Sequence, residues 1–218
     1  MRAILAVPIA SAGLLLAAGC GPADLGPSRT ASLLGQTGWR WVREDARSWK
    51  AEGDALRIRA LPGSLWEKEN TCKNVLVKDL PDGAGDVAVA VTVTSRPVAQ
   101  AEQAGLMLYG DDDHYVKLVR EFTDGALQAV MVIEDGKHLA VVGEKKKLPE
   151  GDTASLRLVR KGGTLAGQYQ DAAGAWREVG TCEAPAWEKV ALFAHGAPAP
   201  ETDRWAEFRG LSIAKPEP

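Results

Sequence analysis

From Trp39 to Ile213 the chain is a succession of short segments in which apolar and polar residues alternate. Successive side chains of an extended strand point to opposite faces, so this period of two predicts β-strands. Gly, Asp and Pro separate the segments, and no stretch shows a convincing helical period. Strands at regular spacing without intervening helices predict an all-β chain built as an antiparallel sandwich or barrel. The expected strands cover 55–60, 74–78, 86–95, 126–133, 138–144, 153–160, 164–170, 175–180, 190–194 and 205–214.

The segment 86–95 shows the alternation most clearly. Its four valines share one face, and the opposite face carries only Ala and Thr. A strand that is apolar on one side and small on the other suits the middle of a sheet. We therefore expect this strand in the middle of one sheet, with its valines in the core.

The segment 101–121 reads as two strands joined by an acidic turn. Two pairings are possible, and a four-residue loop would bring Lys117 onto the face of Leu106. A five-residue loop over 110–114 pairs Tyr109 with Tyr115 and keeps the charge out of the core, so we expect this register. The second face then carries five polar or aromatic residues: Gln103, Tyr109, Tyr115, Lys117 and Glu121. This face could stack on a sugar ring, or it could be an ordinary cross-strand pair with a surface ion pair.

The N-terminus has the pattern of a targeting segment. Arg2 is followed by an apolar run and then by small residues before Cys20, as in a bacterial lipoprotein signal. We expect 1–19 to be a signal peptide, 20–36 a flexible tether and 37–215 the folded domain, anchored to a membrane of the bacterial cell envelope by lipid on Cys20. An ordinary secretory signal, with Cys20 incidental, is the alternative.

Assigning Cys20 to lipid leaves two further cysteines. In an exported protein Cys72 and Cys182 could form a disulfide. The alternative is that both are buried free thiols. Neither has the spacing to another Cys or His that a zinc site requires.

Composition excludes some function classes. The 218 residues carry a formal net charge of −3 and no stripe of Lys and Arg, which argues against a nucleic-acid partner. No Gly-rich run lies between a strand and a helix, so nucleotide binding has no support. We expect no cofactor, and the sequence does not indicate the oligomeric state.

Catalytic motifs are weak. The chain lacks the E-x-D-x-E strand of sandwich glucanases, and Glu67 and Glu69 fall in what reads as a loop. Its histidines have no spacing typical of a nucleophilic triad. The run 111–113 reads as a solvated turn, although loop carboxylates leave a structural calcium ion possible. Enzymatic activity is thus disfavoured but open.

Seven tryptophans are more than the core of one small sandwich can hold. One or two exposed indoles would make a stacking platform. We expect Trp66, before a charged stretch, and Trp205, after a polar loop, to be those two. His195 follows a core strand and could reach the rim of the same site.

Several of these segments resemble a known family. The runs Gln103–Tyr109 and Asp111–Leu118 look like the concanavalin A-like domain at the C-terminus of family-43 β-xylosidases and the related bacterial domain-of-unknown-function family 1349. The similarity extends to 39–45, 56–58, 65–66, 74–76, 190–194 and 206–208. It implies a jelly-roll sandwich of two antiparallel sheets whose concave face binds ligands. His114 stands where the family often has Asn, and the cysteine pair is not a family feature.

These patterns together lead to a hypothesis of an exported, lectin-like module that binds polysaccharide or glycan through one sheet face or rim. Two alternatives stay open: a glycoside hydrolase with an unrecognised site, and a structural envelope lipoprotein that binds protein partners.

Overall fold

The structure, a computed structural model, describes residues 38–81, 85–136, 138–200 and 203–217. The expected signal segment 1–19, Cys20 and the tether lie outside the described residues. Within them, the only helical element is a short 3₁₀ turn, η2 (Ala46–Ser48), and all other regular structure is β-strand. No described helix is long and apolar enough to cross a membrane.

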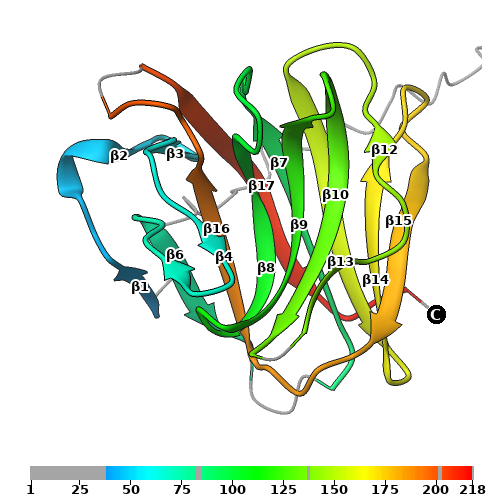
Figure 1. Cartoon of the computed structure of the whole chain (residues 1–218). Coiled ribbons are helices and arrows are strands. Elements are labelled where there is room, and N and C mark those ends of the chain that lie inside the picture. Colours follow the sequence, from blue (N-terminus) through cyan, green and yellow to red (C-terminus); the bar gives the residue numbers. More distant parts are fainter. Residues whose placement is uncertain (1–37, 82–84, 137, 201–202, 218) are drawn as a thin grey trace, which may run out of the picture.

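Two antiparallel sheets pack face to face (Figure 1). The front sheet has the order β1 (Trp39–Val42), β6 (Val75–Asp79), β16 (Lys189–His195), β8 (Gln103–Asp111), β9 (His114–Thr123), β10 (Ala126–Asp135) and β11 (Leu139–Val141), and β12 (Lys146–Lys147) also pairs with β10. The back sheet has the order β15 (Trp176–Glu183), β14 (Thr164–Gln170), β13 (Thr153–Lys161), β7 (Val87–Thr94), β17 (Trp205–Ala214), β3 (Ala55–Arg59) and β2 (Trp49–Glu52). A separate hairpin consists of β4 (Leu65–Trp66) and β5 (Glu69–Asn70).

The expected strands are all present, and their bounds differ by a few residues at most. β7 lies in the middle of the back sheet between β13 and β17, and its valines are buried, as the alternation predicts. The stretch 66–69 is an exception. It was expected to be a loop, but it forms the turn and inner strand ends of the β4–β5 hairpin, which is too short for alternation to reveal.

Strands β8 and β9 adopt the expected register, with Tyr109 opposite Tyr115. The connection is tighter than the five residues expected, because Asp111 already pairs with His114 and the ladder is irregular at Gly110. The inward residues Leu106 and Leu118 lie opposite each other and are fully buried in the core between the sheets.

The outer face of the front sheet carries a second apolar cluster. Leu65 and Cys72, from the segment that holds the β4–β5 hairpin, pack there with Met107, Val119 and Phe193. Tyr109 and Tyr115 belong to this cluster and are 5% and 0% exposed. The expectation that this tyrosine pair is accessible to a sugar is therefore wrong, because the alternation of one hairpin does not reveal that a distant segment covers its second face.

The expected disulfide is also wrong, because Cys72 and Cys182 are both free. Cys72 is buried in the cluster on the outer face of the front sheet, whereas Cys182 lies on β15, at an edge of the back sheet, against the core between the sheets. The two thiols thus belong to different layers of the sandwich.

Candidate functional site

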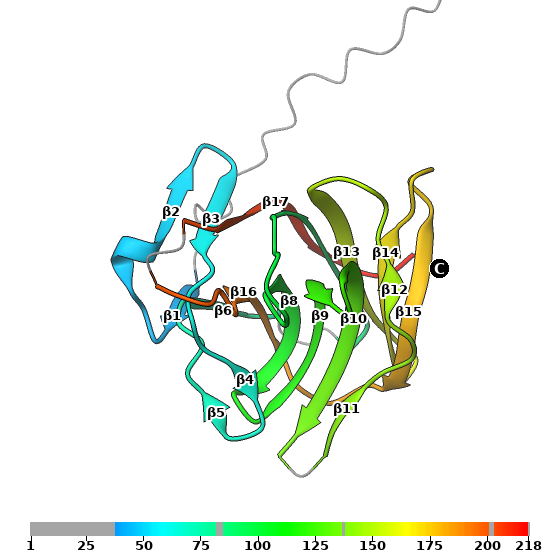
Figure 2. The same cartoon turned by 45° about the horizontal axis from the view of Figure 1, so that its top comes forward.

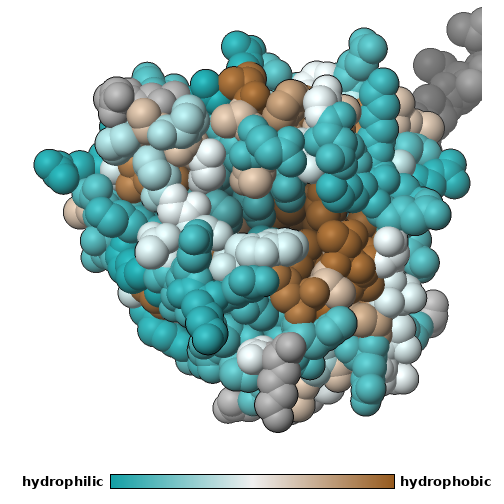
Figure 3. Space-filling view, in the orientation of Figure 1, coloured by the Kyte–Doolittle hydropathy of each residue, from teal (hydrophilic) through white to brown (hydrophobic). Residues whose placement is uncertain are grey.

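A cleft of about 1140 Å³ opens on the outer face of the front sheet. Strands β8, β9 and β10 form its floor, the β4–β5 hairpin forms one wall, and the residues around β11 form the other (Figure 2). In Figure 3 this face shows a hollow with hydrophobic side chains, bordered by hydrophilic ones. The apolar part of the lining comes from Val130 and Val132 of β10 and from Leu139 and Val141.

The strand register arranges the floor in rows. His195, Gln103, Glu121 and Gln128 are consecutive partners across β16, β8, β9 and β10. Because paired residues of neighbouring antiparallel strands point to the same face, these four form one polar row. The next row on the same face, two residues farther along each strand, is apolar. The floor therefore has a polar row next to an apolar one.

The hairpin wall is shaped by local hydrogen bonds. The Thr71 hydroxyl accepts from the amide of Ser64 at 3.1 Å, and the Ser64 hydroxyl accepts from the amide of Trp66 at 2.9 Å. Leu65 is fully buried, and its carbonyl oxygen is hydrogen-bonded to the hydroxyl of Tyr115. With Leu65 directed inward, the next side chain, Trp66, projects outward and is 46% exposed.

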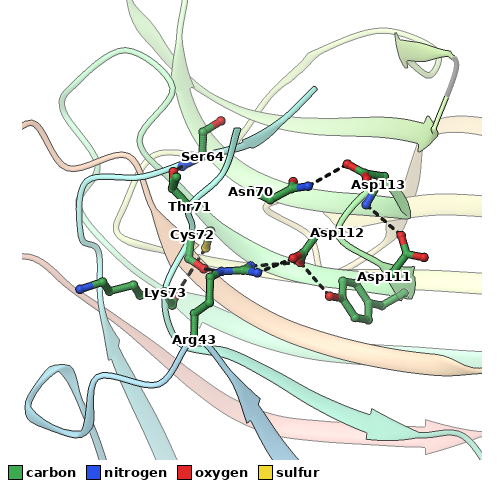
Figure 4. Close-up of polar contacts among 10 residues, drawn as sticks. Arg43, Ser64, Asn70, Thr71, Cys72, Lys73, Asp111, Asp112 and Asp113 are labelled. Carbon is green, nitrogen blue, oxygen red and sulfur yellow. Dashed lines mark hydrogen bonds and ion pairs between the residues drawn. The ribbon is translucent and has the colours of Figure 1, made fainter. Parts of the chain in front are cut away.

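The acidic turn between β8 and β9 holds the hairpin segment in place (Figure 4). Asp112 accepts two hydrogen bonds from the guanidinium of Arg43 and one, at 2.8 Å, from the Tyr109 hydroxyl. Arg43 also donates to the carbonyl oxygen of Cys72 at 2.6 Å, and Asn70 donates to Asp113 at 2.8 Å. The run that reads as a solvated turn is thus an anchor.

Lys117 lies at the centre of the floor and is only 2% exposed. Its ammonium lies 5.9 Å from the ring centre of Trp66 and 5.5 Å from that of Tyr115. It makes no hydrogen bond or ion pair with any described residue. Burial lowers the pKa of Lys117, and the carboxylates of Glu121 and Glu134 oppose that shift.

Two carboxylates share the floor with Lys117. Burial raises the pKa of Glu121, and the neighbouring charges of Lys117 and Lys145 act in the opposite direction. Glu134 is buried and accepts a hydrogen bond from the Tyr115 hydroxyl at 2.7 Å. Glu121 has no hydrogen-bond partner among the described residues, so its carboxylate is available as an acceptor.

His195 and Gln103 end the floor. His195 is 4% exposed and stacks on Phe193 with 5.6 Å between ring centres, and neither ring nitrogen makes a well-aligned hydrogen bond with a described residue. Burial, reinforced by the charge of Lys117, lowers its pKa to about 3, against a small opposing effect from the backbone of Gly63. The side-chain carbonyl oxygen of Gln103 is also buried and accepts no hydrogen bond from a described residue. Such orphaned polar atoms carry a desolvation cost, and functional sites are one place where they occur.

The structure brings most of the predicted site residues together. Trp66, Gln103, Lys117, Glu121 and His195 all line the cleft. Tyr109 and Tyr115 lie beneath the hairpin segment and do not line the cleft. Trp205 is on β17 of the back sheet, half-buried under the side chains of Lys50 and Arg57, and it does not line the cleft.

Several lining residues were not predicted. Glu134, Val130 and Val132 reach the floor because β10 pairs with β9 in register, and Val141 follows on the far rim at 42% exposure. The alternation of 126–133 could have identified the two floor valines if that strand had been paired with β9.

The carboxylates considered as metal ligands or as a catalytic pair lie in the acidic turn and on the β4–β5 hairpin. In the described part of the chain no group of three or more His, Cys, Asp or Glu side chains is placed to hold a metal ion. Asp112, in the acidic turn, is already engaged by Arg43 and Tyr109. Glu67 and Glu69 both belong to the exposed hairpin on one rim.

Solved structures with the same architecture include three informative ones. The GH43 protein BlXynB from Bacillus licheniformis (K247S mutant) superposes with a TM-score of 0.69 at 20% identity, over 81% of this chain and 36% of that one. A functionally unknown protein from Saccharomyces cerevisiae gives 0.62 at 20% identity, over 83% and 97%. The carbohydrate binding module CBM66 from Bacillus subtilis gives 0.54 at 11% identity, over 82% and 96%.

The fold is therefore a concanavalin A-like jelly-roll sandwich, as the resemblance implied. The chain spans about a third of the length of the GH43 protein it matches. No curated protein sequence matches it. The family model described as protein of unknown function (DUF1349) matches residues 41–214, and the chain belongs to that family.

Proposed function

We propose that the cleft binds a polysaccharide or glycan, with Trp66 as its stacking platform. The observation that carries this proposal is a half-exposed indole on the rim above an ammonium, that of Lys117, which makes no hydrogen bond or ion pair with a described residue. Sugars present apolar C–H faces and polar edges. A flat aromatic ring beside free hydrogen-bonding groups complements both.

The size and shape of the cleft favour an oligosaccharide over a single sugar. Its volume of about 1140 Å³ exceeds the ~300–1000 Å³ of ordinary small-molecule pockets. Exposed apolar side chains stand on both rims, Trp66 on the hairpin and Val141 on β11. A chain of sugars lying between them would contact both.

The comparisons with solved structures support the proposal of glycan binding at the level of the fold. A carbohydrate binding module and GH43 proteins have this sandwich. At 11–20% identity the likeness carries no ligand over to this chain, so the proposal depends on the cleft.

The cellular location is part of the same proposal. The sequence before the domain supports export and a lipid anchor on Cys20 in the bacterial cell envelope. Mass spectrometry of the mature N-terminus tests this. A diacylglyceryl-modified Cys20 at the first position is expected, and an unmodified Cys20 or cleavage elsewhere would refute the anchor.

The binding proposal is tested by affinity electrophoresis of the full-length protein in gels that contain plant or microbial polysaccharides. We expect at least one polysaccharide to retard the protein, and Trp66→Ala to weaken binding about tenfold or more, equivalent to ~1.4 kcal/mol. Trp205→Ala is the matched control, since it removes an indole outside the cleft, and should leave retardation unchanged.

Two results would contradict the proposal: no retardation by any polysaccharide, or equal losses in the two tryptophan variants. Release of reducing sugar that is lost in Glu67→Gln or Glu69→Gln would instead identify a glycoside hydrolase.

A further inference from the structure

We infer that the cleft selects uncharged sugars and that Lys117 and Glu121 determine this specificity. This inference rests on the proposed function, because it names the class of sugar that the same cleft takes. It follows from the charges and unpartnered groups of the floor.

Lys117 could by itself suggest an acidic sugar, since a buried ammonium favours a nearby anion. Its charge, however, is already offset. The carboxylates of Glu121 and Glu134 are close enough to act on it electrostatically, one farther along β9 and one on β10. An anionic ligand would gain the attraction of Lys117 and at the same time meet the repulsion of both carboxylates.

The lining as a whole carries more carboxylates than lysines. Three lysines line the cleft, Lys68, Lys117 and Lys145. Five carboxylates line it, from Glu67, Glu69, Asp113, Glu121 and Glu134. One of the lysines, Lys145, is further engaged by Asp124 at 2.8 Å. The potential inside the cleft therefore disfavours a carboxylated or sulfated chain.

Sugar hydroxyl groups, by contrast, can form hydrogen bonds with both Lys117 and Glu121. Lys117 offers donors and Glu121 offers an acceptor, and a hydroxyl can serve either as acceptor or as donor. Their α-carbons are about 13 Å apart along β9, at ~3.3 Å per residue, with Val119 on the same face between them. Adjacent sugars of a neutral chain could therefore reach both groups.

Two neighbours in the polar row of the floor, His195 and Gln103, are uncharged. His195, with its lowered pKa, is uncharged, and it pairs across the sheet with the amide side chain of Gln103. Both are more than nine-tenths buried, and among the described residues their side chains hold polar atoms that lack a well-aligned hydrogen bond. This part of the floor offers uncharged hydrogen-bonding groups and no additional cation for an acidic substituent.

The test compares matched pairs of soluble polysaccharides that share a backbone: dextran with dextran sulfate, galactan with polygalacturonate, and hydroxyethylcellulose with carboxymethylcellulose. Affinity electrophoresis of the full-length protein at about 0.15 M and about 0.5 M salt separates specific binding from general attraction of charge. We expect the neutral member of at least one pair to bind about tenfold or more tightly than its acidic partner at both salt concentrations.

Two variants connect the result to the named residues. Lys117→Met should weaken binding of the neutral polymer about tenfold, because its donors are lost. Glu121→Gln removes one repulsive charge and should narrow the difference between the neutral and acidic members. Circular dichroism and the thermal midpoint verify that each variant is folded, and Asp79→Asn, at the exposed end of β6 away from the lining, is the control.

The outcomes separate the two proposals. Equal or tighter binding of an acidic polymer, lost in Lys117→Met, would overturn the selection of uncharged sugars and leave glycan binding in the cleft intact. Retardation by no member of any pair would contradict glycan binding itself, and this inference with it.

Discussion

Arg43 and Asp112 are 69 residues apart in sequence and form a two-pronged ion pair in the structure. Arg43 directly follows β1 and has a positive φ of 52°, a conformation that non-glycine residues rarely adopt. The pair joins the edge of the front sheet to the turn between its central strands. Through the bond from Arg43 to the Cys72 carbonyl oxygen it also fixes the segment that carries Trp66.

Replacing Asp112 by Asn should destabilise the fold by about 2 kcal/mol, because a partly buried guanidinium and a buried tyrosine hydroxyl both lose their charged acceptor. Urea unfolding followed by tryptophan fluorescence measures the loss. Asp79→Asn is the matched control, since Asp79 also accepts two bonds from one arginine, Arg40, but the pair is exposed. It should cost less than about 0.5 kcal/mol. Equal losses in the two variants would show that Asp112 is not an anchor.

Gly105→Ala should destabilise the protein by about 3 kcal/mol or prevent folding. A Cβ at this position would lie within 2.8 Å of the Cα of Val119 on the neighbouring strand and would also clash with the Leu118 carbonyl oxygen. The backbone atoms of β8 and β9, two central strands of the front sheet, cannot move aside without a large cost in free energy. Gly85→Ala, where a Cβ meets no atom within 4 Å, is the control for the substitution itself. A soluble Gly105→Ala variant with an unchanged unfolding midpoint would refute the steric argument.

His195 should make the protein less stable as the pH falls. Its pKa is about 3 in the folded state and near 6.5 when unfolded, so below pH 6.5 the unfolded chain binds a proton that the folded chain does not. Between about pH 7.5 and about pH 5 this group alone would remove up to ~2 kcal/mol. Urea unfolding of the wild type and of His195→Gln at the two pH values isolates its part, because other groups titrate in both.

When the pH falls from about 7.5 to about 5, the free energy of unfolding should decrease more in the wild type than in His195→Gln. His138→Gln, which replaces an exposed histidine, should behave as the wild type does. Identical pH slopes for the wild type and His195→Gln would mean that His195 is protonated in the folded protein or is not buried.

The two cysteines of the domain should remain reduced and should differ in reactivity. Burial raises the pKa of Cys72 to about 12 and also raises that of Cys182, which is less deeply buried. Because the thiolate is the reactive form, iodoacetamide should label Cys182 first in the native protein and Cys72 only after unfolding. Peptide mass spectrometry resolves the two sites. A disulfide-linked peptide joining them would contradict the structure.

The strands and the central register could be predicted because they follow from local chemistry. Alternation along 86–95 identifies β7, and the cost of burying Lys117 in the core between the sheets selects the pairing of Tyr109 with Tyr115. The resemblance added the two-sheet topology, which alternation alone leaves open between sandwich and barrel.

The environment of the tyrosine pair could not be predicted in this way. Tyr115 is covered by Leu65, fifty residues earlier in the chain, in a segment with no periodic pattern. An amphipathic second face has the same sequence whether it meets water or a covering segment. The function of Asp112 was missed for the same reason, since its partner Arg43 belongs to a different strand connection.

The β4–β5 hairpin is fastened on both sides of its tip, by Leu65 beneath it and by the bond from Asn70 to Asp113. Between these fastenings the four residues of 66–69 are all exposed, and Trp66 meets the floor of the cleft through the ammonium of Lys117. These four positions can therefore be substituted without removing a buried side chain. Libraries randomised over 66–69 would alter the charge and aromatic character of one wall, while the scaffold and the opposite wall stay as they are.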